Sequence, residues 1–84
     1  MEFREMTFNE AEVIIAGWRN DPAIEEAEPG VEICDCNGDL DVKDAVSGNY
    51  ETGRYIGGVS GILSECDRCH RKFFATIQNH FMVD

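Results

Sequence analysis

Apolar residues near the start of the chain recur at the spacing of one face of an α-helix. They lie three or four positions apart, at Phe8, Ala11, Ile14, Ile15 and Trp18. This periodicity favours an amphipathic helix whose stripe faces a core. Directly before it, Thr7-Phe8-Asn9-Glu10 matches a capping box, in which the Thr7 hydroxyl accepts from the Glu10 amide. We predict a helix over residues 8–19, with Trp18 as a core aromatic rather than a contact for a partner.

A second helix start is indicated at Asp21-Pro22, where Asp21 would be the N-cap and Pro22 the first helical residue. Three glutamates follow, and Pro29-Gly30 ends the segment. We therefore expect at most two helical turns before residue 29.

From residue 31 the signals are those of β-strands and tight turns. Asn37-Gly38 suits a type I′ turn, which predicts a hairpin over Val31–Val42 with Cys36 opposite Asp39. The glycine-rich stretch 47–61 predicts a second hairpin that turns at Gly57-Gly58. Further strands are expected at residues 72–77 and 81–83.

Four cysteines form two close pairs, Cys34-Asp35-Cys36 and Cys66-Asp67-Arg68-Cys69, with 29 residues between the pairs. This layout is typical of a four-thiolate zinc site, and a bound metal can compensate for the thin core of an 84-residue chain. Alternate α-carbons of a straight strand are about 6.6 Å apart, so the chain must bend at Cys34-Asp35-Cys36 to bring both sulfurs to one ion.

The cysteine arrangement over residues 31–77 resembles the zinc-ribbon and treble-clef modules, in which paired knuckles hold one ion. The first pair departs from their usual pattern, since its spacer is one residue and no glycine follows it. The resemblance implies a structural Zn²⁺ bound by Cys34, Cys36, Cys66 and Cys69. We expect an α+β fold in one domain, residues 1–84. Its N-terminal amphipathic helix (helical part 7–28) would pack on a small antiparallel, zinc-ribbon-like β-module (31–83).

Other interpretations of the same residues remain open. His70 could replace a cysteine as a ligand, and Cys66-Asp67-Arg68-Cys69-His70 matches a haem attachment motif with Met82 as a possible axial ligand. A redox-active Cys66–Cys69 pair or two disulfides are further alternatives. The acids around Asp39 resemble a calcium loop, but its glycine is misplaced.

Charge is the second informative property of the chain. The net charge is −10, and residues 1–53 contribute 14 acids against Arg4, Arg19 and Lys43. Such a field disfavours direct binding to nucleic acid and favours a protein partner with a basic surface. The alternative is an acidic surface that only keeps the chain dispersed. The predicted partner face comprises Glu25, Glu26, Glu28, Glu32, Asp39, Asp41 and Asp44.

The location expected from the sequence is cytoplasmic. The N-terminus is acidic rather than signal-like, and no apolar run approaches the roughly 18 residues that a membrane-spanning helix needs. A reducing compartment would favour metal binding over disulfides.

We expect a non-catalytic protein, because four thiolates would leave the metal no open position. In size and charge the chain is similar to small acidic phage-encoded inhibitors, including DNA mimics and anti-CRISPR proteins. That resemblance implies that it occludes the basic nucleic-acid-binding surface of a partner. A small zinc enzyme or redox protein is a less favoured alternative. Trp18, Phe73 and Phe74 could equally serve a homodimer. The main alternative is a zinc-ribbon nucleic-acid-binding or transcription-associated module, with a patch of Arg54, Tyr55, Arg68, Arg71, Lys72, Phe73 and Phe74.

Overall fold

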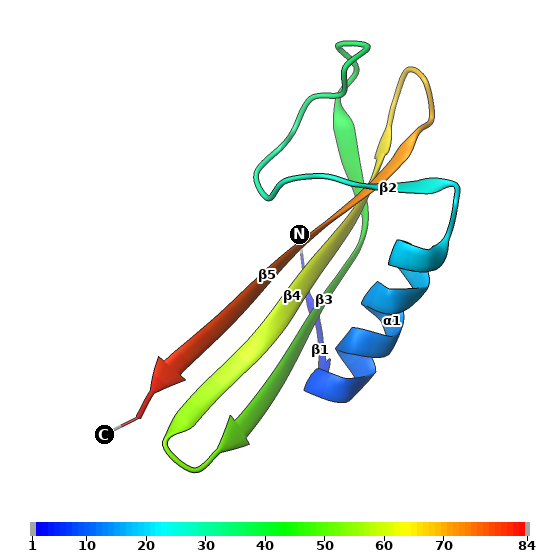
Figure 1. Ribbon diagram of the computed structural model, residues 1–84. Helices are drawn as coiled ribbons and strands as arrows, with labels where there is room; N and C mark the ends of the chain where they lie inside the picture. Colours follow the sequence, from blue (N-terminus) through cyan, green and yellow to red (C-terminus); the bar gives the residue numbers. More distant parts are fainter. Residues whose placement is uncertain (1, 84) are drawn as a thin grey trace.

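One helix packs against a mixed five-stranded sheet in the computed structural model, which describes residues 2–83. The strands lie in the order β1-β3-β4-β5-β2 (Figure 1). The elements are β1 (Arg4–Thr7), α1 (Phe8–Asn20), β2 (Ile24–Glu26), β3 (Leu40–Thr52), β4 (Tyr55–Cys66) and β5 (Lys72–Met82). The predicted α+β class is confirmed. The sheet itself is longer and more mixed than the small antiparallel module that was expected.

Three long antiparallel strands, β3, β4 and β5, form the centre of the sheet. The short strands β1 and β2 add parallel edges, with Arg4 beside Val46 and Ile24 beside Lys72. Because these two edges are joined through α1, the helix crosses one face of the sheet (Figure 1). The opposite face carries no helix among the described residues.

The predicted N-terminal helix is confirmed, and it extends one residue further, to Asn20. Thr7 is its N-cap, and its hydroxyl oxygen accepts from the Glu10 amide at 3.3 Å. The same hydroxyl donates to the Glu10 carboxylate at 2.9 Å. At 13 residues α1 is short, and no helix within residues 2–83 is long and apolar enough to cross a membrane.

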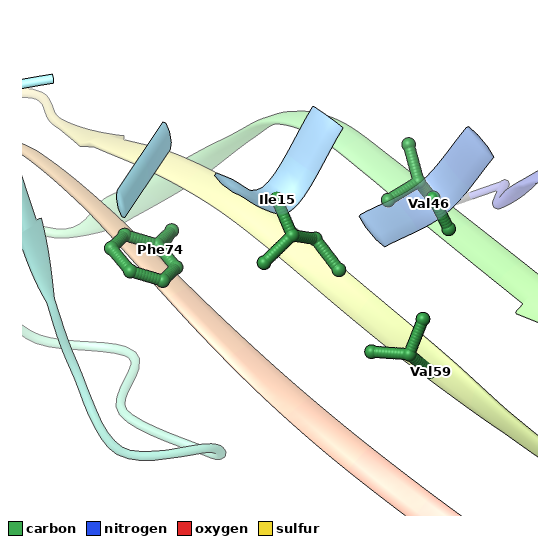
Figure 2. Close-up of a cluster of buried hydrophobic side chains, with 5 residues drawn as sticks. Ile15, Val46, Val59 and Phe74 are labelled. Atoms are coloured by element: carbon green, nitrogen blue, oxygen red, sulfur yellow. The ribbon is translucent and has the colours of Figure 1, made fainter. Parts of the chain in front are cut away.

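The core lies between α1 and the sheet. It contains Ala11, Ile15, Val46, Val59 and Phe74, each at most 2% exposed. Figure 2 shows Ile15 on the helix beside Val46, Val59 and Phe74, which come from the three central strands. Gly61 lets the helix approach β4 closely, since a Cβ at this position would lie 2.9 Å from Cγ1 of Ile15. Trp18 packs half-buried against this cluster, in agreement with its predicted role.

The helix predicted after Asp21-Pro22 is wrong. Asp21 instead accepts the Ala23 amide at Oδ1 (2.9 Å), a local bond that turns the chain away from helical geometry. The chain then enters β2, where Ile24 packs against the core and pairs with β5. Tertiary packing and sheet pairing outweigh a helix signal that was at most two turns long.

The turn predicted at Gly57-Gly58 is also misplaced. The β3–β4 hairpin turns at Gly53-Arg54, where Gly53 has a φ of 57°, and Thr52 pairs with Tyr55. Gly57 lies inside β4, where a Cβ would stand 2.7 Å from the Tyr50 ring. This glycine therefore makes room for an aromatic side chain on the neighbouring strand. The two strands predicted at 72–77 and 81–83 are one continuous strand, β5.

Candidate metal centre

The first cysteine pair lies on a tight turn at one end of the sheet. The Asn37 amide donates to the Cys34 carbonyl at 2.8 Å, and the Cys34 amide donates to the Gly38 carbonyl at 2.9 Å. Ile33 pairs with Asp39, so the predicted two-residue turn with Cys36 opposite Asp39 is wrong. Asn37 has a φ of 68° and takes the left-handed position of a longer hairpin loop. This loop supplies the bend that Cys34-Asp35-Cys36 needs.

The second pair lies on the turn between β4 and β5. Cys66 ends β4, its amide donates to the Arg71 carbonyl at 2.9 Å, and its carbonyl accepts the His70 amide at 3.1 Å. His70 has a φ of 62°. In both turns the residue directly after the second cysteine is therefore left-handed, a conformation in which asparagine and histidine are enriched among non-glycine residues.

Direct hydrogen bonds join the two turns, which lie side by side at one end of the sheet (Figure 1). The Asp67 amide donates to the Asp39 carbonyl at 3.0 Å, and the Asp39 amide donates to Oδ1 of Asp67 at 2.9 Å. The Arg68 guanidinium donates to the Cys36 carbonyl at 3.2 Å. Gly38 is buried at this contact, and a Cβ there would lie 2.5 Å from Sγ of Cys66.

These turns bring all four predicted cysteines into one cluster. Their sulfur atoms all lie within 4.8 Å of one another, with Cys34–Cys69 at 3.6 Å and Cys36–Cys66 at 3.4 Å. In a tetrahedral site with Zn–S bonds of about 2.3 Å, sulfurs are roughly 3.8 Å apart. Cys34 and Cys66 are buried, and all four cysteines are free thiols. The cluster is positioned to bind a metal ion.

Backbone amides donate to sulfur atoms of this cluster and favour their thiolate form. The Cys69 amide, helped by the Arg68 amide at 3.4 Å, lowers the pKa of the Cys66 thiol to about 6. The Arg71 amide also lowers the pKa of the Cys69 thiol, but burial and three neighbouring sulfurs outweigh it and raise that pKa to about 12. Without a bound cation, the cluster thus favours negative charge on Cys66 and disfavours it on Cys69.

The alternative ligands do not join the cluster. The His70 side chain is 73% exposed, and its Nδ1 faces Glu65 at 3.7 Å. Met82 lies at the far end of β5, about 33 Å along the strand from Lys72, which rules it out as an axial ligand beside Cys69. A strand rather than a helix follows the second pair, unlike the thioredoxin-type arrangement.

The seven predicted acidic residues differ in their contacts. Asp44 is paired with Arg4 at 2.6 Å, and Glu25 is paired with Arg71. Within residues 2–83 no ion pair involves the other five, which are all exposed: Glu26, Glu28, Glu32, Asp39 and Asp41.

The predicted basic and aromatic patch is not assembled. Arg54 and Tyr55 lie at the distal hairpin, and Arg68 lies beyond the other end of β4, about 37 Å along that strand from Tyr55. Phe74 is buried in the core, and Arg71 covers Phe73 at 5.1 Å while paired with Glu25. The two groups cannot form one local nucleic-acid surface.

The sequence reasoning missed a cavity on the face of the sheet opposite α1. Residues 27–33 cross this face as a strap and enclose a cavity of about 520 Å³. Its lining is mainly apolar, with Val42, Ile62, Ala75 and Ile77 from the sheet, and Glu28, Glu32 and Asp39 also contribute to it. The signal was present in Phe73-Phe74-Ala75-Thr76-Ile77, which is apolar on both faces of its strand.

Comparison of the chain with protein-family models, with curated proteins and with solved structures found no match.

Proposed function

We propose that the chain is a non-catalytic zinc-binding protein that acts by binding a protein partner with a basic surface. The observation that carries the proposal is that Glu28, Glu32 and Asp39, which form no ion pair within residues 2–83, line an apolar cavity, and that Asp39 is hydrogen-bonded to the second cysteine turn. Zinc would join the first cysteine turn, from which the strap and β3 extend, to the turn between β4 and β5, and so fix the position of the strap and its acids.

Zinc suits the cluster because four thiolates around one ion are typical of structural zinc sites, with tetrahedral S₄ iron as the chief competitor. Elemental analysis of the purified protein tests this assignment. We expect one zinc per chain. Iron in the purified protein, with the absorption of an iron–thiolate centre, would contradict it.

A non-catalytic role is supported by the chemistry of the described residues. Four sulfur ligands would close the coordination sphere, so the metal would not be a site for substrate. Within residues 2–83 no polar or charged side chain is fully buried. The pKa values of Arg4 and Arg71 are raised by the carboxylates of Asp44 and Glu25, and both arginines lie in exposed ion pairs.

The partner we propose offers basic side chains around an apolar one. Glu28 and Glu32 would attract the basic groups, while the cavity between the strap and the sheet would take the apolar side chain. A nucleic-acid-binding groove presents such basic groups. The inhibitor version of the proposal is that this acidic end occupies a groove of that kind and displaces nucleic acid.

Displacement of fluorescent DNA from a panel of purified nucleic-acid-binding proteins tests the inhibitor version. We expect release of DNA from a susceptible member, with an affinity that falls as salt rises. The double variant Glu28→Gln/Glu32→Gln should lose most of this effect. The control Glu5→Gln/Glu51→Gln removes the same charge away from the cavity and should retain it.

Two results would contradict the proposal. One is displacement that is insensitive to salt and to both double variants. The other is direct binding of DNA or RNA by the chain itself in a gel shift, which would favour the nucleic-acid module instead.

A further inference from the structure

The free edge of β5 is open along most of its length. β4 pairs with β5 from Lys72 to Met82, whereas β2 pairs with its other side only from Lys72 to Phe74. In Figure 1 the C-terminal half of β5 lies at the margin of the sheet, with no strand from residues 2–83 outside it. The Phe74 carbonyl accepts the Ala27 amide at 2.8 Å, which shows that the backbone groups of Phe74 point outward. By alternation, those of Thr76, Gln78 and His80 also point outward.

This edge lacks the features that normally prevent strands from pairing. Charged side chains, proline and bulges protect natural sheet edges. Residues 73–83 form the longest stretch of the chain without Asp, Glu, Lys or Arg, they contain no proline, and the register of β5 with β4 is regular. The opposite edge differs, since β3 has a bulge between Val42 and Asp44 and carries charges there.

The exposed side chains of β5 are self-complementary in one antiparallel register. A two-fold axis at Asn79 would place Ile77 opposite Phe81 of a second copy, and Phe81 opposite its Ile77. Both side chains are exposed, at 46% and 63%. Ile77 lines the cavity opposite α1, and by strand alternation Phe81 lies on the same face. The outward-pointing Gln78 and His80 would then occupy the hydrogen-bonded positions, and Asn79 a non-hydrogen-bonded one.

We propose that two copies of the chain pair antiparallel through the free edges of β5, about a two-fold axis at Asn79. The two sheets then form one continuous sheet. Phe81 of the second copy extends the apolar lining of the cavity beyond Ile77. This association requires neither the metal assignment nor the basic partner.

Salt dependence separates this proposal from partner binding. Two chains of charge −10 repel one another, and salt screens that repulsion. The dimer therefore strengthens as salt rises, whereas binding to a basic partner weakens. Either association can fail without the other.

Sedimentation equilibrium of the zinc-loaded full chain tests the proposal. We expect twice the 9.4 kDa chain mass, with a dimer fraction that grows with salt. Gln78→Pro removes an outward amide without taking a donor from the β4 pairing, and it should give a monomer. Ile77→Lys should also give a monomer, and Val13→Lys, at a helix position that is 73% exposed, should not. Circular dichroism confirms that each variant is folded.

Cross-linking tests the register. Facing residues at a non-hydrogen-bonded antiparallel position have α-carbons about 4.5 Å apart, so Asn79→Cys should form an intermolecular disulfide rapidly under mild oxidation. The matched control is Asn49→Cys, an exposed position on β3, which should not form this disulfide. A monomer at all salt concentrations would overturn the proposal. So would a dimer that persists in both Gln78→Pro and Ile77→Lys, or one in which Asn79→Cys cross-links no faster than Asn49→Cys.

Discussion

The substitution Gly38→Ala, which adds one methyl group in the first cysteine turn, should lower the affinity of the cluster for zinc. Gly38 does not have a positive φ, so alanine can adopt its backbone conformation and the effect comes from contact alone. The added Cβ would lie 2.5 Å from Sγ of Cys66, and 2.9 Å from both Cγ of Arg68 and Oδ1 of Asp67. Because ordinary contacts are about 3.5–4.0 Å, the sulfur must move by roughly 1 Å.

The size of the effect follows from this displacement. Metal–ligand distances tolerate changes of about 0.2 Å, so Cys66 cannot stay in place as a ligand unless the turn rearranges. Overpacking of this kind costs about 1–3 kcal/mol. At about 1.4 kcal/mol per tenfold change, the Kd for zinc should rise roughly 5- to 150-fold in Gly38→Ala.

Competition with a chromogenic chelator measures this Kd, and Gly17→Ala provides a control with the same chemical change. Gly17 is exposed on α1, and a Cβ there meets nothing within 4 Å. Gly17→Ala should leave zinc affinity unchanged and stabilise the fold by about 1 kcal/mol, because alanine favours the helix. Equal zinc affinity in Gly38→Ala and the unaltered chain would refute the proposed packing of the two turns.

Three further predictions concern the turns, the core and pH. His70→Gly should retain zinc and be at least as stable as the unaltered chain. His70→Val should lose about 1–2 kcal/mol of unfolding free energy, because the backbone at this position is left-handed. Loss of zinc in His70→Gly would instead identify the imidazole as a ligand. Ile15→Ala should lower the free energy of unfolding by about 2–5 kcal/mol, and Val13→Ala by less than about 0.5 kcal/mol. Urea denaturation measures both values, and equal losses in the two variants would refute the assigned helix face. Zinc must displace the protons of its thiol ligands, so zinc affinity should fall as pH decreases. The pKa of the Cys66 thiol is lowered to about 6 before metal binds, which keeps this ligand ionised at neutral pH. A zinc affinity that does not change with pH, measured by chelator competition, would contradict thiolate ligation.

Local signals in the sequence were sufficient for some elements and not for others. The helix over residues 8–19 was predictable because its cap and its apolar stripe agree, and the cysteine cluster because close spacing leaves few geometries. Asp21-Pro22 wrongly indicated a helix, because the Asp21 side chain accepts a backbone amide in a turn as readily as at a helix start. Gly57-Gly58 misled because glycine serves close packing inside a strand as well as turns.

Long-range pairing could not be inferred from local patterns. β1 and β2 are short and depend on the distant strands β3 and β5, and the cavity exists because residues 27–33 return across the sheet. Acidic composition likewise could not show that Asp44 and Glu25 are paired with Arg4 and Arg71, while Glu28 and Glu32 remain at the cavity.

Native mass spectrometry of the purified chain, followed by thermal unfolding with and without a strong chelator, tests the metal centre most directly. We expect the mass of the chain plus one zinc ion, and a large loss of cooperative unfolding once the metal is removed in the presence of a reductant. Cys66→Ser should reproduce that loss without a chelator. A metal-free chain that unfolds cooperatively at the same temperature under all of these conditions would contradict the account.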